Sequence, residues 1–263
     1  MDGATRVNRM SASDLEDDRW VNSIIKELEW SADARGMLFA SGVVLVEGET
    51  ELAALPIWFA KSDAAHISGC GPMDLHIAFL SVGGDTAFGS FLFYLERFGV
   101  PWTVVCDGAA FRLDTTNHIL EQVMKADPGN RELQDSLQEL DLPEKKQADM
   151  SAELFQSMVD IGHEHGVFTL ASGWSRKSES DGDNESFESF VLSRTYLWDA
   201  FARAKEAAGR SKPRVGRLLA DATDCPSEVS DLYGQILNRL RKQGMRQLSA
   251  RLTSDGKPSL KPT

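Results

Sequence analysis

Short apolar runs without helical spacing recur along the first two thirds of the chain. Val43 to Val46 is one such run, with mostly β-branched residues, and Trp102 to Cys106 is another. Runs of this kind are typical of strands that are buried on both faces of a parallel sheet. Ile77 to Val82 and Val167 to Ala171 have the same character. The pattern therefore predicts four strands, of which Val43 to Val46 and Trp102 to Cys106 are buried.

Segments with helical periodicity separate these runs. Gly48 ends the first run, and we expect Thr50 to cap a helix whose apolar positions include Leu55 and Trp58. A second amphipathic segment, Phe88 to Phe98, follows the second run. Strands that alternate with helices in this way predict an α/β fold with a parallel sheet and right-handed crossovers.

Polar residues stand directly after the predicted strands. Glu47 and Asp107 each follow a buried strand, Glu51 falls in the first turn of the next helix, and Ser172 follows the fourth strand. The carboxyl ends of parallel strands share one edge, where ligands of open α/β sheets bind. Neighbouring carboxylates there repel each other, take up a proton or hold a cation, and we favour the cation. Gly83-Gly84 forms either a tight turn or a phosphate cradle.

The order of these features resembles a known family. An apolar run that ends in Glu-Gly before a helix, with a later strand that ends in Asp, resembles the Toprim fold of topoisomerases, bacterial primases and some nucleases. The wider string is similar to the nuclease half of the OLD (overcoming lysogenisation defect) family, in which a Toprim module follows an ATPase. The resemblance covers about residues 30 to 220 and is carried by Leu38-Phe39-Ala40, Val46-Glu47-Gly48-Glu49-Thr50-Glu51 with Leu55-Pro56, Val82-Gly83-Gly84, Phe98-Gly99-Val100-Pro101-Trp102 and Cys106-Asp107-Gly108.

The resemblance implies a divalent-metal-dependent DNA endonuclease that uses two Mg²⁺ or Mn²⁺ ions. Glu47 and Asp107 would hold one ion, and Glu51 with Glu188 of the Phe187-Glu188 step would hold the other. The alternative for Glu188 is an acid that the helix dipole favours in a first turn. Ser172 is a further ligand candidate.

Lys212, in the Lys-Pro step, corresponds to a catalytic lysine of the family. Its ammonium would offset charge that builds up on the phosphate, with water as the nucleophile and no covalent intermediate. The alternative is an exposed lysine without a catalytic role.

One position departs from the family pattern. Most Toprim proteins have Asp-x-Asp where this chain has Asp107 followed two residues later by Ala109. Another carboxylate or a water can fill that place, or the likeness is structural only. The alternative function is therefore a non-catalytic Toprim-like module that recruits protein or nucleic-acid partners.

The charge distribution modifies the DNA-binding prediction. The chain of 263 residues has a net charge of −12, which by itself disfavours nucleic acid. However, residues 201–263 hold 13 of the 28 basic side chains and only 6 of the 40 acidic ones, so this part can meet phosphate. The other interpretation is a solvated helix face, formed by Arg239, Arg241, Lys242 and Arg246.

Several classes of protein are not indicated. No apolar run approaches the roughly 18 residues that span a bilayer, and the polar start does not resemble a secretory signal, so we expect a cytoplasmic protein without a membrane partner. Three widely spaced cysteines predict free thiols and neither a disulfide framework nor a zinc site. His163 and His165 lie two residues apart on a helix, which predicts solvated side chains and not a metal pair.

The predicted organisation has four parts. Residues 1–38 form a linker and lead-in helix, 39–114 and 167–222 the Toprim core, 115–166 an inserted helical subdomain, and 223–263 a helical tail. No Gly-x-x-x-x-Gly-Lys-Ser/Thr phosphate loop occurs in the sequence. We therefore expect a carboxy-terminal piece of an ATPase-nuclease, with DNA and the ATPase domain as partners and a homo-oligomer as a possible assembly.

Overall fold

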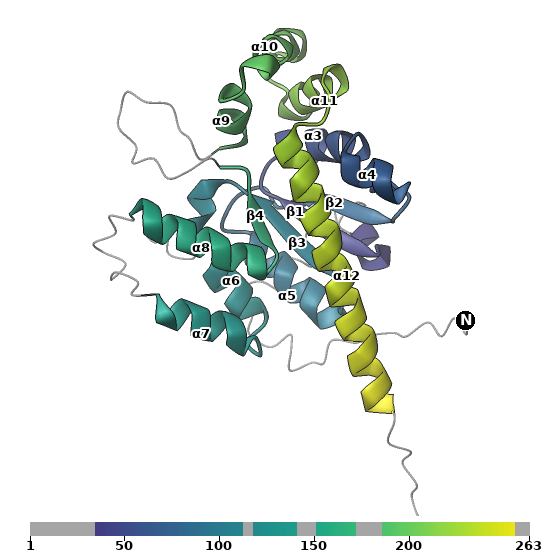
Figure 1. The fold of residues 1–263 in the computed structure, drawn as a ribbon, viewed down its shortest axis with the longest axis vertical. Coiled ribbons are helices and arrows are strands. Elements are labelled where there is room, and N and C mark those ends of the chain that lie inside the picture. The colour runs from purple at the N-terminus through teal and green to yellow at the C-terminus, as the bar shows by residue number, and fades with distance from the viewer. Residues whose placement is uncertain (1–34, 113–117, 141–150, 172–185, 256–263) are drawn as a thin grey trace, which may run out of the picture.

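A computed structural model describes residues 35–112, 118–140, 151–171 and 186–255, and for residues 246–255 it describes the backbone alone (Figure 1). Within these ranges the chain forms one parallel sheet with helices on both faces, which confirms the predicted α/β, Toprim-like class. Helices dominate the regions after the third strand, and the long last helix crosses the molecule beside the sheet. None of the helices in the described part of the chain is both long and apolar enough to cross a membrane.

The sheet has the order β2-β1-β3-β4, and all three strand pairs are parallel. Its strands are β1 (Gly42–Val46), β2 (Ile77–Ser81), β3 (Trp102–Cys106) and β4 (Val167–Thr169). Each matches a predicted strand, although β2 ends one residue and β4 two residues earlier than expected. Val46 pairs with both Ser81 and Val105, so the carboxyl ends of β2, β1 and β3 are level with one another.

The helices follow the strands in the expected alternation. They are α3 (Glu49–Ala60), α4 (Asp63–Ser68), α5 (Phe88–Phe98), α6 (Ile119–Ala126), α7 (Arg131–Glu139), α8 (Ala152–Glu164), α9 (Phe187–Leu192), α10 (Thr195–Ala208), α11 (Lys212–Ala222) and α12 (Ser227–Asp255). Two short 3₁₀ turns, η2 (Met37–Phe39) and η3 (Gly108–Phe111), precede β1 and follow β3.

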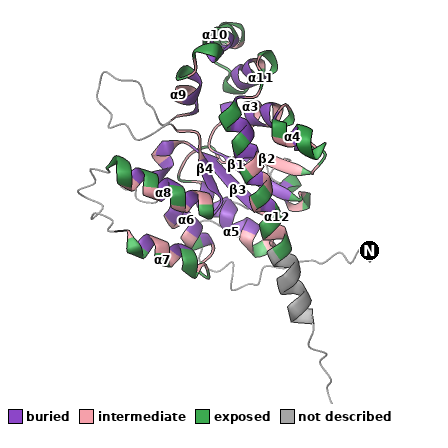
Figure 2. Ribbon diagram, viewed as in Figure 1, coloured by how far each residue is buried: buried purple, intermediate pink, exposed green. Residues whose placement is uncertain are grey.

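The central strand β1 separates two hydrophobic cores. Val43 and Leu45 pack into one core with α5, α6, α7 and α8, whereas Val44 and Val46 pack into the other with α3 and α9 to α12. This follows from the alternation of side chains along a strand. All four side chains are fully buried, and each such burial stabilises the fold by about 1.5–3 kcal/mol. Figure 2 shows the buried residues concentrated on β1, β3 and β4 and on the inner helix faces, whereas the edge strand β2 is mostly half-buried.

The start of α3 differs from the prediction. The helix begins at Glu49, and its N-cap is Gly48, which makes no side-chain capping bond. Thr50 is therefore not the cap but a buried residue of the first turn. Because Gly48 has no Cβ, the Glu51 carboxylate occupies the space beside it, where a Cβ would lie 2.7 Å from Glu51 Oε2.

The helices of residues 118–164 pack directly on the sheet core. Leu120 of α6, Leu133 of α7 and Met158 of α8 belong to the same hydrophobic core as α5. The division of the chain into a core and an inserted subdomain stays a prediction. The expectation of solvated histidines is wrong for His165, which is 3% exposed, because the chain turns from α8 into β4 beneath α12 at this point.

Candidate active site

The carboxyl edge of the sheet carries three polar residues side by side. Glu47 follows β1, Ser81 ends β2 and Asp107 follows β3. The Asp107 N–H donates to Glu47 Oε2 at 3.2 Å, and Ser81 Oγ donates to the Glu47 carbonyl at 3.3 Å. The level strand ends therefore bring the two predicted carboxylates together.

Helices that follow in the sequence add further groups to this edge. Glu51 lies in the first turn of α3, Glu188 in the first turn of α9 and Lys212 at the start of α11. The start of α9 is fixed there because the Phe187 N–H donates to Asp107 Oδ1 at 2.9 Å.

These elements surround one cavity of about 360 Å³. It is lined by Glu47, Gly48, Glu49, Thr50, Glu51, Ser81, Gly83, Gly84, Asp107, Glu188 and Lys212. Five of the six predicted site residues thus lie around a single cavity, although they are up to 165 positions apart in the sequence. The sixth, Ser172, lies outside the described residues. Gly83 and Gly84 have φ angles of 78° and 148°, so the turn needs glycine there.

The environment of the carboxylates opposes their ionisation. Burial, followed by the charges of Glu47 and Glu51, raises the pKa of Asp107 to about 8, against the Phe187 hydrogen bond that lowers it. Burial, with the charges of Glu188 and Glu47, raises the pKa of Glu51 to about 7. Burial also raises the pKa of Glu47, although the Asp107 N–H opposes this. The cavity therefore concentrates more negative charge than its lysine offsets, and a cation would relieve it.

The donor set fits a hard divalent cation. Every acidic group that lines the cavity is a carboxylate, and oxygen ligands are those that Mg²⁺ and Mn²⁺ prefer. In the described residues, however, no three His, Cys, Asp or Glu side chains are grouped closely enough to hold one ion together. The carboxylates are spread around the cavity and do not meet at one point.

Two polar residues near the cavity were missed from the sequence. Ser81 lines it, and the charge of Asp85 raises the pKa of Glu47. Ser81 was detectable as the last residue of a strand that neighbours β1, and Asp85 as the acid directly after the glycine pair. Ala109, the departure from the family pattern, lies on η3 and is half-buried.

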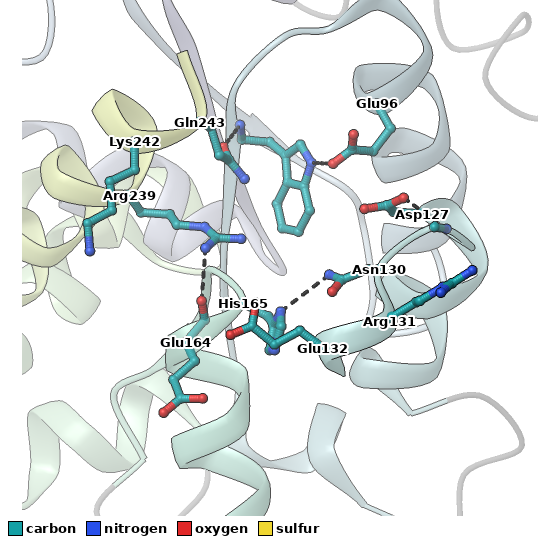
Figure 3. A pocket seen from close by; sticks show the side chains of 12 residues that line it. Glu96, Asp127, Asn130, Arg131, Glu132, Glu164, His165, Arg239, Lys242 and Gln243 are labelled. Atoms are coloured by element: carbon teal, nitrogen blue, oxygen red, sulfur yellow. Dashed lines mark hydrogen bonds between the residues drawn. The ribbon is translucent and has the colours of Figure 1, made fainter. Parts of the chain in front are cut away.

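A second, larger cavity of about 680 Å³ lies at the opposite end of the sheet, where Trp102 begins β3 (Figure 3). Arg239 and Lys242 reach it from α12, across from Asn130 and Arg131 of the α7 start. Arg239 donates to the Glu164 carbonyl at 2.9 Å. Both acidic and basic side chains line this cavity, and none of the site residues predicted from the sequence does, so the smaller cavity is the candidate site.

A comparison with models of known protein families matches the part of the chain that contains β1, β2 and β3. Residues 38–108 match the family model of the Overcoming lysogenization defect protein-like TOPRIM domain. These residues are similar to the OLD-like Toprim domain. They include Glu47, Glu51 and Asp107, whereas Glu188 and Lys212 lie beyond the matched part. The predicted resemblance is confirmed.

One solved structure extends the likeness of fold beyond the residues that the family model matches. The C-terminal region of the Xanthomonas campestris pv. campestris OLD protein is 15% identical, has a TM-score of 0.52 and covers 80% of this chain and 99% of its own. The C-terminal region of the Burkholderia pseudomallei OLD protein is 18% identical, with a TM-score of 0.40, and covers 78% of this chain and 99% of its own. No curated protein matches the chain.

Proposed function

We propose that this chain is a divalent-metal-dependent DNA endonuclease that hydrolyses phosphodiester bonds at the carboxylate cavity. The observation that supports it most is that Glu47, Glu51, Asp107, Glu188 and Lys212, each chosen from the sequence, line the same cavity. A Toprim domain of the OLD-like type is compatible with a metal-binding, nuclease-type chemistry.

The acids have distinct places in this proposal. Glu47 and Asp107 would hold one Mg²⁺ or Mn²⁺ ion, and Glu51 and Glu188 a second, with Ser172 as a further predicted ligand. When bound, such ions supply positive charge to the phosphodiester and lower the pKa of water. Asp107 and Glu51, whose pKa values burial and neighbouring charges raise, would bind such ions as carboxylates, so cation binding would be favoured at higher pH.

Lys212 would act on the phosphate. Among the described residues that line the cavity it is the only base, and it lies in the first turn of α11 next to the exposed Arg214. A preorganised ammonium at this position offsets the charge that builds up in the transition state. Arg214 and Arg217 are exposed on the same helix and would contact the DNA backbone, so binding should weaken with salt.

The complete assembly is also part of the proposal. The described residues contain the sheet edge and no phosphate loop, and the solved structures with a similar fold are C-terminal regions of larger proteins. We therefore propose that an ATPase domain regulates DNA access to this cavity. A homo-oligomer would place two cavities on the two strands of a duplex.

A second candidate function is a non-catalytic interaction module. Ala109 in place of the expected carboxylate favours it, as does the lack, in the described residues, of three acids that meet at one point. This candidate predicts that the cavity binds no divalent cation.

The discriminating experiment incubates the purified chain with supercoiled plasmid in Mg²⁺, Mn²⁺ or EDTA. The parent and Glu206→Gln, which changes an exposed acid of α10, should nick the plasmid with either metal and not in EDTA. Glu47→Gln should be inactive while it unfolds, in EDTA, at or above the parent temperature. Absence of cleavage in the parent, together with no metal-induced rise in its melting temperature, would favour the interaction module.

A further inference from the structure

The uncharged part of the carboxylate cavity is confined to one segment. Besides five acids and Lys212, the cavity is lined by five uncharged residues, which are Gly48, Thr50, Ser81, Gly83 and Gly84. The Glu51 carboxylate occupies the space beside Gly48, and Thr50 is only 3% exposed. The accessible uncharged surface is therefore the end of β2 and the start of the loop that leads to α5.

A phosphate group of a nucleic-acid strand needs such a surface. It is an anion, so nearby carboxylates repel it wherever no cation lies between them. Lys212 contributes one ammonium group, which bonds only some of the phosphate oxygens. The remaining oxygens need hydrogen-bond donors without negative charge, and in this cavity the end of β2 and the following loop provide them.

Gly83 and Gly84 offer main-chain donors at the cavity surface. Gly83 is exposed and Gly84 is half-buried, and neither N–H donates to a backbone carbonyl in the described part of the chain. No atom lies within 4 Å of the place where a Cβ of either residue would stand. A ligand can therefore come close to this backbone, and successive N–H groups of this kind bind phosphate oxygens.

Ser81 adds a side-chain donor next to these glycines. Its Oγ donates to the Glu47 carbonyl at 3.3 Å. This distance is longer than the roughly 2.5–3.0 Å of ordinary O–H···O hydrogen bonds, so the bond is weak. The hydroxyl can therefore turn from the Glu47 carbonyl to a phosphate oxygen at little cost.

Hydrogen bonds fix both ends of this loop before a ligand arrives. At its start the Val82 N–H donates to the Val46 carbonyl at 2.9 Å, and at its end Gln122 Nε2 donates to the Asp85 carbonyl at 2.7 Å. The Gly84 carbonyl, which would repel a phosphate oxygen, accepts a hydrogen bond inside the loop at 3.2 Å. A segment that is already held in place loses little conformational freedom when it binds.

We propose that Ser81, Gly83 and Gly84 form a subsite that binds a phosphate group of the substrate strand, in the same cavity as Lys212. This inference rests on the proposed function, since it names the part of that cavity which contacts the phosphodiester. Asp85, the next acid in the chain, does not line the cavity. Because the subsite contacts phosphate and no base, it recognises a nucleic-acid strand independently of its sequence.

The test compares cleavage of a labelled DNA duplex in Mn²⁺ with the Mn²⁺ affinity of the same protein, measured by calorimetry without DNA. Gly83→Asn places a side chain in front of the backbone, and asparagine tolerates a left-handed φ. Ser81→Ala removes the hydroxyl. In each variant kcat/KM should fall on the order of tenfold, while Mn²⁺ affinity should stay within about twofold of the parent.

Two matched variants control for unrelated effects. Gly69→Asn makes the same change at the end of α4, where φ is 68° and the space at the Cβ is also open. Ser68→Ala removes a hydroxyl that donates to the Ala65 carbonyl, again at 3.3 Å. Both should keep the parent kcat/KM and the parent Mn²⁺ affinity. If Gly83→Asn does not fold, Ser81→Ala decides.

The outcomes separate the inference from the function on which it rests. Parent kcat/KM in the folded variants of Gly83 and Ser81, in a protein that binds Mn²⁺ and cuts DNA, overturns the phosphate subsite alone. A loss of Mn²⁺ affinity as large as the loss of kcat/KM assigns the segment to the ions and also overturns the subsite. A parent chain that neither binds Mn²⁺ nor cuts DNA overturns the proposed function and this inference together.

Discussion

Asp107 holds a carboxylate in a place where ionisation is unfavourable. It is bonded by the Phe187 N–H, but burial and the charges of Glu47 and Glu51 outweigh that bond and raise its pKa to about 8. A carboxyl group whose pKa is higher in the folded than in the unfolded state binds its proton more tightly when folded. Such a group stabilises the fold at low pH and loses that contribution as pH rises towards the folded pKa.

The raised pKa values of Asp107 and Glu51 predict that the stability of the metal-free protein depends on pH. Between about pH 4 and about pH 8 the unfolding free energy should fall, since Asp107 and Glu51 lose protons from the folded state at about pH 8 and about pH 7. Asp107→Asn keeps the acceptor for Phe187 N–H and should gain on the order of 2 kcal/mol relative to the parent between pH 5 and pH 8. Urea unfolding in EDTA measures the unfolding free energy at each pH. If this free energy depended on pH in the same way in parent and variant, the electrostatic account would be contradicted.

Gly48 leaves room for the carboxylate of Glu51. A Cβ at this position would lie 2.7 Å from Glu51 Oε2, so Gly48→Ala should displace the carboxylate of Glu51. Because φ at −123° suits alanine, the variant should keep its fold. Its Mn²⁺ affinity should fall severalfold, and its activity should recover at raised metal concentration. Gly36→Ala, at a helix cap with open space around it, is the matched control for calorimetry. Equal affinities of the two variants would show that the place of Glu51 does not matter.

At the scale of elements, one close helix contact determines where Lys212 lies. Gly216 of α11 faces the Thr50 carbonyl and the Ala53 side chain of α3, with no room for a Cβ. Lys212 is one turn before Gly216 on the same helix. The contact between α3 and α11 therefore brings the base of one helix next to the acid Glu51 of the other.

Gly216→Ala should separate the two helices. Overpacking of this kind costs about 1–3 kcal/mol of unfolding free energy, and we expect DNA cleavage to fall further than metal affinity, because Lys212 moves with α11. Gly234→Ala, on α12 with open space, serves as the control. Chemical unfolding and plasmid nicking on the same samples provide both values. A variant with parent stability and parent activity would refute the close contact.

Lys212→Ala should separate binding from chemistry. If the ammonium acts on the phosphate and not on the ions, metal affinity should stay near the parent value while the cleavage rate falls on the order of 10²-fold. Glu51→Ala and Glu188→Ala should instead weaken metal binding, with activity partly restored at raised metal concentration. Calorimetry and cleavage rates of the three variants decide this, and loss of metal binding in Lys212→Ala would refute the assigned role.

The elements also explain what the sequence could predict. Strands such as β1 and β3 were recognisable because burial on both faces requires unbroken apolar runs, and Glu47 and Asp107 followed from where those runs end. The N-cap of α3 was not recognisable from the sequence. A hydroxyl side chain is only a general preference at helix N-caps, and here the Glu51 carboxylate occupies the space beside Gly48. Asp85 was detectable as the acid directly after the glycine pair, but its effect on the pKa of Glu47 depends on how the fold brings the ends of β1 and β2 together.

At the scale of the whole molecule, the sheet separates two cavities of different character. The cavity at the carboxyl edge is lined by five acids and one lysine, and the cavity at the opposite end has mixed charges, some of them from α7 and α12. The first 200 residues hold most of the acids and the last 63 an excess of bases. An acidic edge next to basic helices would suit the proposed cleavage of a polyanion, and the charge distribution was readable from the sequence.

The most direct test of this account is the anomalous X-ray scattering of crystals grown or soaked with Mn²⁺. We expect anomalous peaks inside the cavity, next to Glu47 and Asp107, and their loss in crystals of Asp107→Asn with the fold unchanged. A well-ordered cavity without any peak at saturating Mn²⁺, or a peak only at another place on the protein, would contradict the claim that this cavity is the metal centre.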